Sequence, residues 1–248
     1  MTISLKCSIF SYRSFGFDGY IMPHPPILRG IQIVIDALRK NGHTVVEWQP
    51  HKHQYAASLS NKIVFADGTA AIKRAIASSD EPPIINIRKV SKFNLPIMDL
   101  VSFWQLQTAK YNYQQEYLAL WQQRSNIDAW ILPVAPHAAV KHDDYKYYGY
   151  STVINILDWP AVSVPVTFAD KRIDIKAMEY KSNNELDAEV YDGYDPDVYH
   201  GAPVGIQVVG KRLQEDYLLG IAEQIDEALN RTFPRRSSSE STYLQPKL

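Results

Sequence analysis

The strongest constraint on the fold is an alternation of helical and strand-like segments along the chain. A helix is predicted to start at Pro23-His24-Pro25-Pro26, because prolines suit the first turn and the apolar residues that follow recur at helical spacing. Asn41-Gly42 ends this pattern, and residues 44–48 follow as a short strand. A helix joined to a strand by a glycine turn is one half of an α/β crossover, so the segment predicts an α/β fold.

Three further apolar runs predict the rest of a sheet, over residues 129–132, 161–166 and 204–209. The run over 129–132 is continuous and has the length of a buried strand, and the other two are further strand candidates. Further helices are predicted from Asp67-Gly68 to Ala77 and over 99–123, before these runs, and over 214–229, after them. The predicted fold class is therefore α/β, with a partial mixed β-sheet flanked by helices.

The helix predicted over 99–123 carries one apolar stripe, with Gln and Lys on its other face. A stripe of this kind most simply indicates core packing. Its members are Phe103, Leu106, Ala109, Tyr113, Tyr117 and Leu120.

The segment between Val166 and Gly201 is less regular and contains Tyr180, Tyr191, Tyr194 and Tyr199. Long irregular segments often cover functional sites, so we interpret it either as such a cover or as a surface hairpin. Residues 234–248 lack periodicity and are predicted to be a disordered tail. With residues 1–16 assigned to an N-terminal extension, the predicted domain covers residues 17–233.

Composition excludes several classes of function. Apolar residues make up 46% of the chain, which is enough to form a core. The 26 basic and 27 acidic residues nearly cancel, so the chain has no net positive charge to attract the phosphates of nucleic acid. No apolar stretch approaches the roughly 18–20 residues of a membrane span, and the N-terminus does not resemble a signal peptide. A single cysteine, Cys7, excludes internal disulfides, and the expected location is cytoplasmic.

The standard catalytic motifs are missing from the sequence. There is no G-x-S-x-G elbow, no phosphate-binding glycine loop and no H-E-x-x-H helix. His51-x-His53 and His142-Asp143-Asp144 lack a third fixed ligand, so we interpret them as solvated loops and predict no metal site. Ser163 lies between valines, and the sequence places no general base beside it, so it is only a weak nucleophile candidate.

Four phrases in a fixed order along the chain resemble one known family. The resemblance covers about residues 17–230, and it is to the C-terminal half of the amidase signature family, particularly its fungal acetamidase-like and general amidase branch. The phrases are FDGY (17–20) followed by PHPP (23–26), DAWILP (128–133), NILDWPAVSVPV (155–166) and GAPVGIQVVGKRLQED (201–216).

This resemblance implies hydrolysis of carboxylic amides to acid and ammonia or amine, without a metal or other cofactor. The family's serine nucleophile, bridging serine and lysine base, together with a Gly- and Ser-rich loop, lie in its N-terminal half. No such loop occurs here, since Ser78-Ser79 and the serines at 237–239 lack neighbouring glycines. Amide hydrolysis needs an activated nucleophile and oriented N–H donors, so no catalytic residue is predicted in this chain.

The same resemblance suggests where this half would contribute to a substrate pocket. The turn from Asn155 to Pro160 and the loop from Pro133 to His137 are expected to line its acyl side. The substrate-binding candidates are His137, Asn155, Asp158, Trp159 and Gln207. Two alternatives stay open: Asp158 could simply cap a turn, and Gln207 could satisfy buried backbone groups.

Two functional interpretations follow. In the first, the chain is a truncated amidase that acts on a small amide only when the missing half is supplied. Half of a sheet would expose an apolar edge, which predicts self-association or pairing with a second polypeptide. In the second, the chain is a non-catalytic module, derived from an amidase, that binds a small molecule or a partner.

Overall fold

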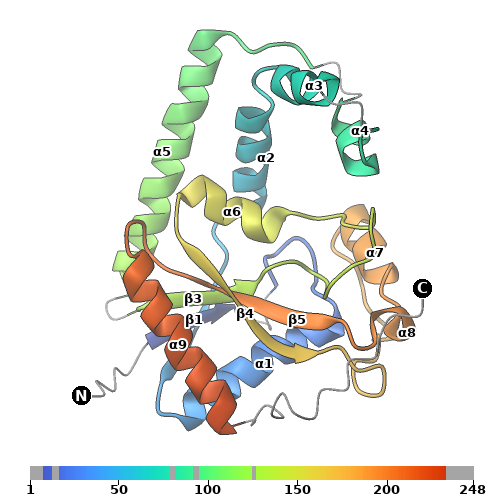
Figure 1. The fold of residues 1–248 in the computed structure, drawn as a ribbon. Coiled ribbons are helices and arrows are strands. Elements are labelled where there is room, and N and C mark those ends of the chain that lie inside the picture. The colour runs from blue at the N-terminus through green and yellow to red at the C-terminus, as the bar shows by residue number, and fades with distance from the viewer. Residues whose placement is uncertain (1–7, 13–16, 79–81, 92–94, 125–126, 233–248) are drawn as a thin grey trace.

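The computed structural model describes residues 8–12, 17–78, 82–91, 95–124 and 127–232. One mixed sheet crosses the middle of this part of the chain, with strand order β2-β1-β3-β5-β4 (Figure 1). The strands are β1 (Ser8–Tyr12), β2 (Thr44–Trp48), β3 (Ala129–Pro133), β4 (Ala161–Phe168) and β5 (Pro203–Val209). β1 pairs in parallel with β2 and β3, whereas β5 pairs antiparallel with β3 and β4. The predicted α/β fold with a mixed sheet is confirmed.

The strand β1 was not anticipated. Residues 1–16 were predicted to be an extension, yet Ser8–Tyr12 lies inside the sheet between β2 and β3. The segment mixes serines with apolar residues and stands between Lys6 and Arg13, so it gives no continuous apolar run. The tail predicted over 234–248 lies outside the described residues.

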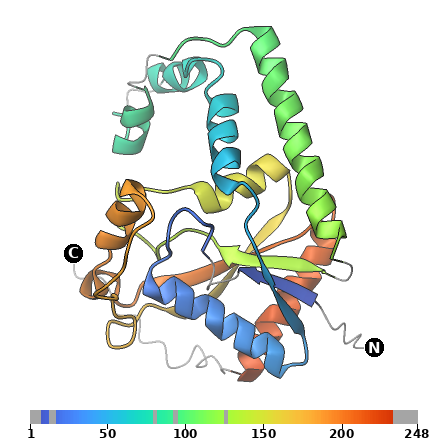
Figure 2. The same cartoon turned by 180° about the vertical axis from the view of Figure 1, so that it is seen from behind.

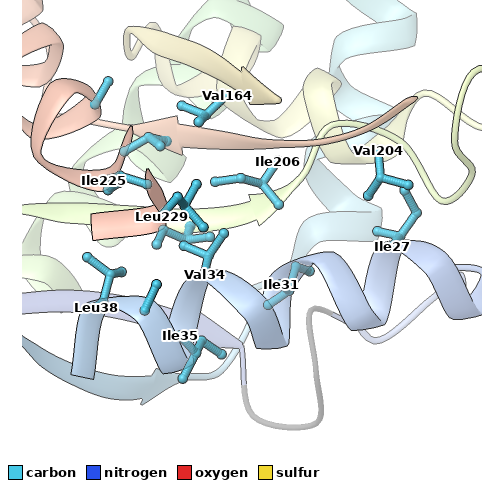
Figure 3. Packing of buried hydrophobic residues seen from close by; sticks show 14 of the residues in the cluster. Ile27, Ile31, Val34, Ile35, Leu38, Val164, Val204, Ile206, Ile225 and Leu229 are labelled. Carbon is cyan, nitrogen blue, oxygen red and sulfur yellow. The ribbon is translucent and has the colours of Figure 1, made fainter. Parts of the chain in front are cut away.

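Helices cover both faces of the sheet (Figures 1 and 2). On one face, α1 (Pro25–Lys40) and α9 (Glu215–Thr232) pack together against β3, β4 and β5. Figure 3 shows this core, in which Ile27, Ile31 and Val34 of α1 point toward the strands. Both helices have the apolar periodicity that predicted them.

On the other face lie α2 (His53–Val64), α5 (Leu100–Gln122) and α6 (Gly149–Leu157). Side chains of β3 alternate between the two cores, with Ile131 in the first and Trp130 and Leu132 in the second. The short helices α3 (Ala70–Ala77) and α4 (Ile85–Ser91) lie at the ends of α2 and α5 that are far from the sheet (Figures 1 and 2).

The helix α5 is buried over only part of its length. Tyr113, Tyr117 and Trp121 of its C-terminal half are buried in the second core. Near its N-terminal end, Val101 and Trp104 are 60% and 59% exposed. The predicted stripe therefore packs mainly in its C-terminal part, and the other face is not purely polar.

The irregular segment after β4 forms neither a plain loop nor a hairpin. Residues 169–202 contain two helices, α7 (Glu185–Asp192) and α8 (Pro196–Tyr199), and no strand. Asn184 caps α7 by accepting the Asp187 N–H at 2.9 Å. The guanidinium of Arg29 in α1 binds Asp174 through two hydrogen bonds of 2.7 and 2.8 Å. The Arg29–Asp174 pair fixes the segment against α1.

Candidate functional site

The topology of the sheet predicts a ligand site at the carboxyl ends of two neighbouring strands. The strands β1 and β3 are parallel neighbours. The chain continues from β1 to α1 on one face and from β3 to α6 on the opposite face. In α/β sheets such a switch point opens a crevice outside the carboxyl ends of the strands. Loop residues 17–24 and 134–148 meet at this edge, where the His24 N–H donates to the Pro136 carbonyl at 2.7 Å.

The first of these loops is held by the buried carboxylate of Asp18. One oxygen of Asp18 accepts the N–H groups of Tyr20 and Ile21 at 2.8 and 2.9 Å. The other oxygen accepts the hydroxyl of Tyr147 at 2.6 Å. Gly19 has φ +86°, which side chains rarely tolerate, so the Asp-Gly pair is what this turn requires. Burial raises the pKa of Asp18, and these hydrogen bonds oppose the rise.

A second buried carboxylate ties the segment after β4 to the same loop. Asp187 is fully buried and accepts the N–H of Met22 at 2.7 Å. It also accepts the Asn183 N–H at 2.8 Å and the Tyr180 hydroxyl. Two acidic side chains, one from the loop and one from α7, thus fix residues 17–24.

Two buried histidines lie at the centre of the site. Nε2 of His24 is 2.8 Å from the Val190 carbonyl, and Nδ1 of His137 is 3.0 Å from the Ala138 carbonyl. A carbonyl oxygen only accepts, so these two nitrogens carry the ring protons. The remaining nitrogens, Nδ1 of His24 and Nε2 of His137, are therefore bare acceptors. Both are buried, and neither has a hydrogen-bond partner among the residues that the structure describes.

Both rings line one small pocket, which has about 10 Å³ of space open to a water molecule. Burial lowers the pKa of His24 to about 4 and also lowers the pKa of His137, so both rings are neutral at neutral pH. The pocket is enclosed by residues of the loop after β3 and of the segment after β4: Asp144, Lys146, Val190, Gly193 and Tyr199.

Of the predicted substrate-binding residues, only His137 lines this pocket. Nε2 of Gln207 donates to the carbonyls of Pro133 and Tyr150 at 2.7 and 3.0 Å. This is the alternative in which Gln207 satisfies buried backbone groups. A role for Gln207 in binding substrate stays a prediction.

The other three candidates lie away from the pocket, because the predicted turn from Asn155 is instead the end of α6. Asn155 is exposed on that helix. Asp158 ends the helix in the left-handed conformation and pairs with Arg212 at 2.7 Å, as the capping alternative anticipated. Trp159 packs edge-on against Tyr117 and Trp121. Their binding roles stay predictions, and the structure does not bring them together with His137.

The sequence interpretation missed three residues of the site. Asp18 and His24 both stand in the first family phrase, and their polar side chains between apolar neighbours were the available signal. For Asp187 there was none, since it contacts residue 22 across 165 positions.

Two of the three histidines considered as metal ligands have other contacts. Nε2 of His53 lies 2.9 Å from the Tyr117 hydroxyl, and that of His51 lies 2.9 Å from the Glu116 carboxylate. Within the described ranges, no three His, Cys, Asp or Glu side chains are grouped as a metal site would need. The same ranges contain no helix with the length and apolarity needed to cross a membrane.

Comparison with known proteins shows the family to which this chain belongs. The family model described as Amidase matches residues 12–219. A solved structure of a fatty acid amide hydrolase superposes on 90% of this chain, and on 40% of its own, with a TM-score of 0.83 at 24% identity. The chain has the fold of amidase signature enzymes and belongs to the amidase family.

Among individual proteins, the chain is 47% identical to an acetamidase of Emericella nidulans over 220 residues. It is 46% identical to an acetamidase of Aspergillus oryzae over 224 residues. These matches cover 87% and 88% of this chain but only 40% and 41% of the two relatives. The chain thus spans about two fifths of the length of the curated relatives that it matches.

Proposed function

We propose that this chain forms part of the sheet and one wall of the substrate pocket of an amide hydrolase. In this proposal, the catalytic serines and lysine lie outside these 248 residues. The identity of 47% to an acetamidase, over only 40% of that protein's length, is the observation that supports it most strongly. The proposed reaction is hydrolysis of a small carboxylic amide to acid and ammonia, and acetamide is the first substrate to test.

The surroundings of Ser163 support a nucleophile located elsewhere. Ser163 lines a groove between β4 and α9. The titratable side chains that line this groove with it are all carboxylates: Glu223, Asp226 and Glu227. A serine nucleophile needs a general base and oriented N–H donors for the oxyanion. Among the described residues, neither a histidine nor a lysine lines the groove.

Two exposed surfaces of this chain could contact the missing part of such an enzyme. The strand β4 is at the end of the strand order of the described sheet, so one of its edges is open to another strand. In the N-terminal half of α5, Val101, Trp104 and Tyr111 are each about 60% exposed at helical spacing. We propose that the missing half of the enzyme covers these surfaces, either as another segment or as a second polypeptide.

A chimera tests the proposal. The matching 220-residue segment of the Emericella nidulans acetamidase is replaced by this chain, and ammonia release from acetamide is measured. Activity comparable to that of the parent acetamidase is the expected result. A folded, soluble chimera that releases no ammonia would contradict the proposal and favour the alternative of a non-catalytic binding module.

A further inference from the structure

The pocket between His24 and His137 has an unusual arrangement of hydrogen-bonding groups. The two side chains are 2% and 7% exposed, and their ring centroids are 6.1 Å apart. Each ring donates its only proton to a backbone carbonyl. Both rings line one cavity, and each keeps one bare acceptor nitrogen. The two nitrogens cannot hydrogen-bond to each other because neither carries a hydrogen.

Buried acceptors of this kind need a donor. Leaving a buried polar atom without a partner is unfavourable, and a polar cavity of this size commonly holds one small molecule with two or more hydrogen bonds. The pocket has space for about one molecule the size of water. Its occupant must bring at least two hydrogens, one for each ring.

The charges around the pocket favour a neutral occupant. Lys146 lines the pocket, and the charge of Lys176 also acts on His24. Both ammonium groups are paired with carboxylates. Lys146 lies 3.8 Å from Asp144 and 3.3 Å from Glu189, and Lys176 lies 3.2 Å from Asp192, so little net charge remains to attract an ion. A metal ion would find only two nitrogen ligands, whereas zinc takes four.

We propose that His24 and His137 together bind one small neutral hydrogen-bond donor, water or ammonia, between Nδ1 of the first ring and Nε2 of the second. Water comes from the solvent. Ammonia would come from the amide hydrolysis proposed above, so only that source rests on the proposed function. The bound molecule joins the loop after β1 to the loop after β3.

Nitrogen NMR of the whole chain, labelled with ¹⁵N-histidine, tests this directly. At pH 7 we expect His24 as the Nε2–H tautomer and His137 as the Nδ1–H tautomer. Both acceptor nitrogens should resonate upfield of a free, unbonded imidazole nitrogen, as they do when they accept a hydrogen bond. His24→Gln and His137→Gln assign the signals, and His142→Gln, in an exposed position of the same loop, should leave both unchanged.

Titration separates the two sources. Ammonium chloride, at a pH high enough to form neutral ammonia, should shift both acceptor signals saturably if ammonia binds. Trimethylamine has no hydrogen to donate in its neutral form and should not shift them. If both acceptor signals indicate hydrogen bonding but do not shift when ammonia is added, the bound molecule is water. This result also supports the proposal.

Three results would overturn it: an acceptor nitrogen with the shift of an unbonded ring, protonated rings at pH 7, or stoichiometric Zn²⁺ binding to both rings. None of these measurements depends on amide hydrolysis, so failure here is distinguishable from failure of the proposed function.

Discussion

The carboxylate of Asp187 accepts the backbone N–H of Met22 at 2.7 Å, across 165 positions of the sequence. This hydrogen bond joins α7, in the segment after β4, to the loop that follows β1. His24 lies two residues after Met22 and contacts the Val190 carbonyl of the same helix. The segment that the sequence marked as irregular is therefore fixed to the switch point of the sheet, where it helps to enclose the histidine pocket.

Replacing Asp187 by Asn should destabilise the chain strongly. The buried carboxylate accepts several hydrogen bonds, and a hydrogen bond to a charged group contributes about 1.5–3 kcal/mol. We expect the free energy of unfolding in urea to fall by about 3 kcal/mol. Asp192→Asn, at an exposed position of the same helix paired with Lys176, is the matched control and should change it by less than about 1 kcal/mol. Equal losses in the two variants would contradict this role for Asp187.

Gln207→Leu should also lower stability. The substitution removes the hydrogen bonds that Gln207 donates to the buried carbonyls of Pro133 and Tyr150, and each such bond contributes about 0.5–1.5 kcal/mol. Urea unfolding should show the loss. Gln115→Leu, at an exposed position of α5, should be nearly neutral. A Gln207→Leu variant as stable as the parent would show that the two carbonyls do not depend on this side chain.

Stability should fall on acidification below pH 6.5. The pKa of His24 is about 4 in the folded chain against 6.5 for the free side chain. Between these values the unfolded state binds the proton and the folded state does not, so unfolding becomes easier by about 1.4 kcal/mol per pH unit for this group. The stability that depends on neutral His24 is fully present above pH 6.5 and is lost by about pH 4.

The His24→Gln variant provides the comparison for this pH effect. Its free energy of unfolding should change less steeply with pH between pH 6.5 and 4.5. Other groups are common to both proteins and cancel in the comparison. They include Asp18, whose raised pKa favours the folded state at acid pH. Identical slopes would mean that His24 is not buried in its neutral form.

The exposed apolar residues of α5 should cause self-association of the chain by itself. Exposed apolar patches commonly mark surfaces that bind another protein or aggregate. Trp104→Glu introduces a charge into this patch and should shift the sedimentation profile toward monomer. Met178→Glu changes a fully exposed apolar side chain of the segment after β4 and should not. A chain that is monomeric before any substitution would contradict the expectation.

Local periodicity predicted much of the fold. The helices α1 and α9 and the strands β2, β3 and β5 follow from apolar spacing and glycine or proline signals. The helix α6 was missed because Thr152, Val153 and Ile154 are β-branched and disfavour a helix when considered alone. Packing against α2 and α5 outweighs that preference.

The site was less predictable, because it depends on contacts between distant segments. His137 was identified in its loop, but its partner His24 is 113 positions earlier and belongs to a different strand connection. Trp159 looked like a pocket residue because it is aromatic and follows a polar turn. In the structure it packs against Tyr117 and Trp121 in an aromatic core. Spacing along the chain cannot separate these two outcomes.

The most direct test of the central claim is ammonia release from acetamide by this chain alone, assayed beside the acetamidase chimera. If the nucleophile and base lie outside these residues, only the chimera releases ammonia. Release by the chain alone at a rate near that of the chimera, abolished by Ser163→Ala, would show that it carries its own nucleophile and would contradict the account.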